Sequence, residues 1–168
     1  YPSKVQTLTT GGSVVLPLPQ NSYEEMTLRY PLGTEDYEAL TGREFDKEAW
    51  KNINRCIFVG KEDNPQPGSR SQWYGSLRYL DLVSKVHGDR RVTERFPFIK
   101  SQYNTAAPNT STFELFEGVG HSVSPKMEQA AVEYHKNTAD PKTKTIEVEI
   151  VNPTLDPSTV STESPSSH

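Results

Sequence analysis

The sequence has few of the residues that build a large apolar core or a disulfide framework. Only 33% of its 168 residues are hydrophobic, and the mean hydropathy is -0.72. Average globular domains contain about 45–50% apolar residues on a count that includes glycine. Cysteine occurs once, as Cys56, so an internal disulfide is impossible and a disulfide-stapled miniprotein is excluded. We therefore expect a modest core, or a core that is completed by residues outside this chain.

Other absences exclude whole classes of function. Long apolar runs are missing, and none approaches the roughly 20 residues that a membrane-spanning helix needs. The 18 basic and 22 acidic residues give a net charge of -4, which argues against nucleic-acid binding because that binding depends on a basic surface. The four histidines and the single cysteine show no zinc-binding spacing, and Gly11-Gly12-Ser13 is too short for a phosphate-binding loop. We expect no membrane span, nucleic acid, metal or cofactor.

The composition divides the chain into three parts. Residues 1–55 are expected to be an extended, lid-like segment with two short helices, the second capped by Asp46. Residues 56–151 are expected to hold the folded portion. Residues 152–168 are rich in Ser, Thr and Pro and are predicted to be a disordered tail, since they bury too little to offset their ordering entropy. No signal-peptide pattern follows Tyr1, so we expect a processed chain or part of a longer one, and the compartment stays undetermined.

Two apolar runs predict strands, and helical spacing of apolar residues predicts helices between and after them. CIFVG is continuous and apolar, which is typical of a strand buried on both faces, whereas TFELFE alternates. Pro97 is expected to kink or interrupt the second helix. The strands are expected at 56–60, 112–117 and 146–151, and the helices at 73–86, 92–102 and 125–137. This order predicts a parallel α/β sheet with flanking helices.

Two polar side chains follow the first two of these strands. Asp63 comes shortly after the first, and His121 comes after the second across Gly118-Val119-Gly120. In a parallel sheet the carboxyl ends of the strands meet at one edge, where ligands bind. A carboxylate there can accept the Nδ1 proton of the imidazole and leave Nε2 free as a base. The pair is thus a candidate for proton chemistry.

Each candidate has a structural alternative. An aspartate after a strand most often stabilises a turn, and Glu62 is a competing acid that we disfavour only because its side chain is longer. Ser69 and Ser71 suit a solvated turn better than a nucleophile. His87 and His135 end predicted helices and are interpreted as structural or surface residues.

Parts of the sequence resemble the C-terminal portion of an α/β-hydrolase. CIFVGKEDN (56–64) and FELFEGVGHSVSPKM (113–127) are similar to the strand that bears the acid, the last main strand, the catalytic histidine and the final helix. YPLGTEDYEALTGREFDKEAW (30–50) looks like the segment before the acid strand in esterase-like members. The resemblance implies that Asp63 is the acid and His121 the base of a Ser-Asp-His triad. The implied reaction is hydrolysis of a small ester or amide, without a cofactor.

The nucleophile of that family is missing from this chain. The family places its serine in a G-x-S-x-G elbow, and neither Ser13 nor Ser122 has the second glycine. We therefore expect the N-terminal half of the hydrolase to be a separate or cleaved chain, or to have been lost by truncation. The chain alone is then inactive, and it associates with that half or with itself. The alternative is a non-catalytic interaction module that retains the hydrolase-like ending.

Overall fold

The computed structural model describes residues 4–12, 14–64 and 77–138, with only the backbone described at 77–80. The predicted strand at 146–151, the predicted tail and the loop serines Ser69 and Ser71 lie outside the described residues.

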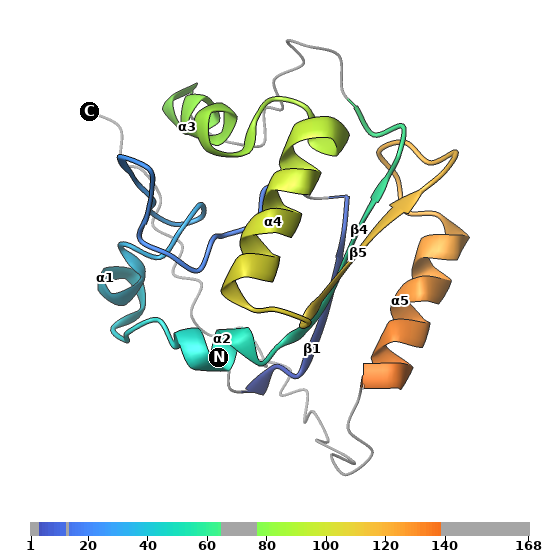
Figure 1. The fold of residues 1–168 in the computed structure, drawn as a ribbon, viewed down its shortest axis with the longest axis horizontal. Helices are drawn as coiled ribbons and strands as arrows, with labels where there is room; N and C mark the ends of the chain where they lie inside the picture. The colour runs from blue at the N-terminus through green and yellow to red at the C-terminus, as the bar shows by residue number, and fades with distance from the viewer. Residues whose placement is uncertain (1–3, 13, 65–76, 139–168) are drawn as a thin grey trace, which may run out of the picture.

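A three-stranded parallel sheet forms the centre of the described fold. It consists of β1 (Thr7–Gly11), β4 (Asn54–Gly60) and β5 (Ser111–Phe116), in the order β1-β4-β5 (Figure 1). The register pairs β4 with β5 from Arg55 opposite Ser111 to Gly60 opposite Phe116. The two strands predicted around 56–60 and 112–117 are therefore confirmed, and they are parallel neighbours.

Strand β1 was not predicted. Its sequence, TLTTG, contains one large apolar residue, and it becomes a strand by pairing in parallel with the first five residues of β4. The more apolar run Val14–Leu16 is irregular. Pairing with an apolar neighbour thus outweighs the weak local pattern of β1.

Helices cover both faces of the sheet. On one side lie α3 (Leu77–His87) and α4 (Phe96–Ala106), and on the other lies α5 (Pro125–Thr138) (Figure 1). The side chains of β4 alternate between these layers: Ile57 and Val59 pack with α3 and α4, whereas Cys56 and Phe58 pack with α5. This three-layer arrangement confirms the mixed α/β class with a parallel sheet and flanking helices.

Proline interrupts the predicted helix 92–102, as expected. A π-helical turn, η3 (Arg91–Arg95), comes first, and α4 starts at Phe96 with Pro97 in its first turn. Pro97 has no backbone N–H, and the first turn of a helix is where that donor has no helical partner. The π-helical turn η3 therefore ends where α4 begins, and it lies next to the loop that follows β4.

The segment before β4 packs onto the same core as α4. It contains α1 (Tyr37–Thr41), α2 (Lys47–Lys51) and a short hairpin of β2 (Ser22–Tyr23) and β3 (Met26–Thr27). Asp46 caps α2 as predicted, because its side chain accepts a hydrogen bond of 2.8 Å from the backbone N–H of Ala49. Three leucines of this segment are completely buried against α3 and α4: Leu18, Leu28 and Leu32.

Two aromatic side chains of this segment pack against α4. The ring of Tyr23 meets Phe98 edge to face, and that of Trp50 meets Tyr103 in the same way. Arg55 is buried and lies 3.9 Å from the centroid of the Trp50 ring. These contacts give Tyr23 and Trp50 a packing role. Among the described helices, none has the length and apolar character needed to cross a membrane.

Candidate functional site

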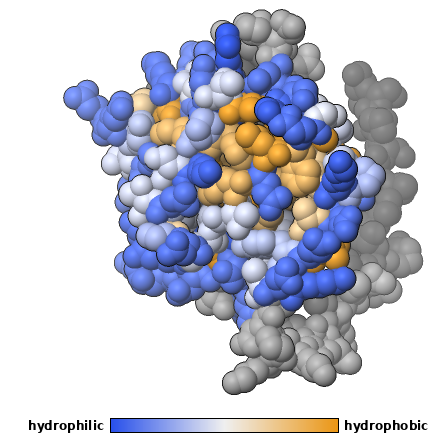
Figure 2. Space-filling model, turned by 45° about the vertical axis from the view of Figure 1, so that its right-hand side comes forward, coloured by the Kyte–Doolittle hydropathy of each residue, from blue (hydrophilic) through white to orange (hydrophobic). Residues whose placement is uncertain are grey.

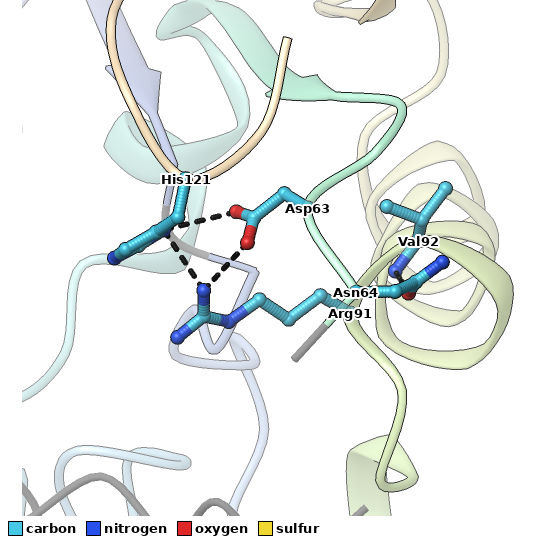
Figure 3. A network of polar contacts seen from close by, with 5 residues as sticks. All are labelled: Asp63, Asn64, Arg91, Val92 and His121. Carbon is cyan, nitrogen blue, oxygen red and sulfur yellow. Dashed lines mark hydrogen bonds and ion pairs between the residues drawn. The ribbon is translucent and has the colours of Figure 1, made fainter. Parts of the chain in front are cut away.

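Asp63 and His121 meet at the carboxyl edge of the sheet. Oδ2 of Asp63 lies 3.0 Å from Nδ1 of His121, and the two side chains approach from the loops that follow β4 and β5 (Figure 3). The sequence predicted this convergence, because both residues follow strands that run in the same direction. The contact is a hydrogen bond between a carboxylate and an imidazole.

Close backbone packing brings the two loops together. A Cβ atom at Gly60 would lie 2.1 Å from the carbonyl oxygen of Val119, so only glycine allows the second loop to cross the end of β4. The loops are then joined by two hydrogen bonds of 3.0 Å, from Glu62 N–H to the Val119 oxygen and from Gly118 N–H to Glu62 Oε1. Glu62, the competing acid, therefore stabilises the turn, and Asp63 is the residue that reaches His121.

The two members of the pair differ sharply in exposure. The side chain of Asp63 is 2% exposed, whereas that of His121 is 63% exposed. Nε2 of His121 points away from Asp63 (Figure 3), and no described residue forms a hydrogen bond with it. The arrangement shields the acid from water and leaves the outer ring nitrogen of the histidine accessible.

Arg91 is a third member of the site that the sequence analysis did not identify. Its Nη1 lies 2.7 Å from Oδ1 of Asp63 and 2.8 Å from Nδ1 of His121 (Figure 3). In the sequence, Arg91 belongs to a polar stretch between two predicted helices, and no spacing or composition signal separates it from a solvated arginine. Only the folding of η3 against the loop after β4 brings it to the acid.

The hydrogen-bond network assigns the proton of the neutral imidazole to Nδ1. Arginine only donates hydrogen bonds, so Nδ1 cannot accept from Arg91 and donate to Asp63 at the same time. Asp63 is the one pure acceptor of the three, and a hydrogen bond to a charged group contributes about 1.5–3 kcal/mol. Both groups therefore donate hydrogen bonds to its carboxylate: Arg91 to Oδ1, and Nδ1–H of His121 to Oδ2. Nε2 is left as the acceptor.

The end of β1 also reaches this site. Gly12 follows β1 with a φ of +70°, in the left-handed region that favours glycine, and its N–H donates to the carbonyl oxygen of Phe58. A Cβ at this position would be 4.0 Å from Cε1 of His121. Three strand ends thus border the imidazole.

The other two histidines in the described part of the chain, His87 and His135, lie away from the site. His87 is buried in the core, where Nε2 is 3.3 Å from the carbonyl oxygen of Leu16, and burial lowers the pKa of its imidazole from 6.5 to about 4. His135 is exposed on α5, with Nε2 at 3.2 Å from Oγ1 of Thr9. Within residues 4–12, 14–64 and 77–138, no cluster of three His, Cys, Asp or Glu side chains could hold a metal ion.

Comparison of the chain with protein-family models, with curated proteins and with solved structures found no match. A function for this chain must therefore be argued from the site itself.

Proposed function

We propose that Asp63 and His121 are the acid and base of a Ser-Asp-His triad that hydrolyses an ester or amide. In this proposal the chain is the C-terminal part of an α/β-hydrolase. The observation that carries the proposal is the hydrogen bond between a buried carboxylate and an exposed imidazole at the carboxyl edge of a parallel sheet. A triad requires the same arrangement, in which the acid orients the ring and the base faces the substrate.

Each residue has one role in the proposed reaction. Asp63 accepts the Nδ1 proton and so directs the lone pair of Nε2 towards a serine hydroxyl. Nε2 takes the proton from that serine as the oxygen attacks the carbonyl carbon, and it then gives the proton to the leaving group. Water hydrolyses the resulting acyl-enzyme by the same proton transfers. The serine and the donors that stabilise the oxyanion come from the other half of the hydrolase.

A second candidate function is a non-catalytic interaction module. The sequence contains no G-x-S-x-G elbow, and this observation favours a fold that retains the acid–base pair without the reaction. The two candidates differ in what His121 does in the assembled protein, so a substitution there separates them.

The test combines the 168-residue chain with the polypeptide encoded upstream and measures hydrolysis of p-nitrophenyl acetate. We expect activity in the assembled protein and none in the chain alone. Asp63→Asn should lower kcat by about 10⁴-fold, because the imidazole then loses the acceptor that sets its tautomer. His121→Gln should lower kcat at least as far.

His135→Gln is the matched control, since it changes an exposed histidine on α5 and should leave kcat unchanged. Hydrolysis that persists after His121→Gln would contradict the proposal. A folded, assembled protein that cleaves neither esters nor amides would favour the interaction module.

A further inference from the structure

We propose that Arg91 is a positioning residue of this site, which holds the Asp63 carboxylate so that Oδ2 faces His121 and the imidazole proton stays on Nδ1. The meaning of this role for catalysis rests on the proposed function. The role itself concerns only three side chains of this chain, and it can be measured without any enzyme assay.

The first argument comes from the two oxygens of Asp63. Arg91 Nη1 donates to Oδ1 at 2.7 Å, and His121 Nδ1 lies 3.0 Å from Oδ2, so each oxygen has its own partner. The terminal torsion of an aspartate is broad and roughly two-fold, so the carboxylate can otherwise turn and exchange its oxygens. The ion pair with Arg91 restricts that rotation.

The second argument comes from burial and charge. The Asp63 side chain is 2% exposed and that of Arg91 is 17% exposed, so little water reaches the pair. A buried carboxylate without a counter-charge is strongly unfavourable. Arg91 therefore supplies the counter-charge of the Asp63 carboxylate in a place from which water is nearly excluded, where both carboxylate oxygens accept hydrogen bonds.

The third argument is that the backbone around Arg91 is held by other residues. The N–H of Val92 donates to Oδ1 of Asn64 at 3.1 Å, which joins the start of η3 to the loop after β4. Oε2 of Glu94 accepts hydrogen bonds from the N–H groups of Asp89 and Arg90, at 2.6 and 3.1 Å. A substitution of the Arg91 side chain should therefore leave η3 in place and change the carboxylate alone.

The experiment measures the imidazole tautomer by long-range ¹H–¹⁵N correlation in the ¹⁵N-labelled 168-residue chain, at a mildly alkaline pH. In the wild-type chain we expect His121 to carry its proton on Nδ1. Arg91→Gln frees the carboxylate to turn and so weakens the hydrogen bond between Asp63 Oδ2 and Nδ1–H of His121, and we expect the ratio of tautomers to move by about tenfold towards Nε2–H. Arg91→Lys retains the positive charge at Oδ1 and should keep the wild-type tautomer. His135 serves as the internal reference and should not change.

Two results would overturn the inference: a folded Arg91→Gln chain with the wild-type tautomer, or a wild-type chain with the proton on Nε2. If Arg91→Gln does not fold, Arg91→Lys decides, since Nδ1–H supports the inference and Nε2–H contradicts it. A merely structural role of Arg91 would alter stability without changing the tautomer of the folded variant. A failed ester assay leaves this result intact, and an Arg91→Gln chain that keeps the wild-type tautomer leaves the Asp63–His121 pair and its assay intact.

Discussion

At the scale of single residues, burial gives His87 a measurable effect on stability. The desolvation of its buried imidazole is the main cause of the lowered pKa, the nearby charge of Arg95 adds to it, and the hydrogen bond with Leu16 opposes it. The unfolded chain binds a proton near pH 6.5, whereas the folded chain does so only near pH 4. Between these values the unfolded state holds more protons, so the free energy of unfolding should fall by about 3 kcal/mol as the pH drops from 6.5 to 4.

Urea unfolding at a series of pH values checks this prediction. His87→Leu replaces the imidazole with an apolar group and should remove this part of the pH dependence, whereas His135→Leu, at an exposed position, should retain it. Equal slopes for the wild-type and His87→Leu chains would show that His87 does not control acid stability.

At the scale of elements, α5 is held to the sheet by a small apolar contact. Met127 is its one fully buried residue, and it packs against Cys56 and Phe58 of β4. Met127→Ala should lower the free energy of unfolding by about 2–5 kcal/mol, because the contact is lost and a cavity remains. Val132→Ala on the exposed side of the same helix should change it by less than about 0.5 kcal/mol.

Chemical denaturation of the two variants provides the measurement. Similar losses for Met127→Ala and Val132→Ala would mean that α5 does not depend on this contact. The result bears on the site as well, since α5 begins shortly after His121 and a detached helix would release the loop that carries the imidazole.

At the scale of the whole molecule, the described three-stranded sheet has two outer strands, β1 and β5. Each exposes one leucine: Leu8 on β1 and Leu115 on β5. Hydrophobic residues also gather on one face of the molecule, surrounded by hydrophilic ones (Figure 2). Outer strands with exposed apolar side chains favour association with another chain. We therefore expect the isolated chain to self-associate, and Leu8→Lys should weaken that association because it places a charge on the outer strand.

Sedimentation equilibrium tests this expectation. Leu40→Lys, at an exposed leucine on α1, is the control and should leave the association unchanged. A wild-type chain that is a monodisperse monomer with a cooperative thermal transition would contradict the prediction.

Local patterns explain which features could be predicted. The run CIFVG is apolar at every position because β4 lies between two layers of helices, and its burial confirms the interpretation. Asp46 and Pro97 act on the backbone of adjacent residues, so the helix cap and the helix interruption could also be predicted from the sequence. The approach of Asp63 to His121 followed from the direction of two parallel strands.

Features that depend on distant contacts could not be predicted. The buried guanidinium of Arg55 lies 5.8 Å from the centroid of the Tyr103 ring and donates a hydrogen bond of 3.4 Å to Oγ1 of Thr110, and no local pattern predicts either contact. Strand β1 depends in the same way on pairing with a strand more than 40 residues later. Such contacts exist only after the chain has folded.

The sequence by itself determined the parallel strands β4 and β5 and the presence of an acid and an imidazole at their ends, because hydrophobic periodicity and chain direction are local properties. Only the tertiary structure decided that Asp63 rather than Glu62 meets His121, that Gly12 borders the ring and that Arg91 holds the second carboxylate oxygen. The physical reason is that hydrogen bonds and ion pairs act over about 3 Å, and only folding brings groups from separate loops within that distance.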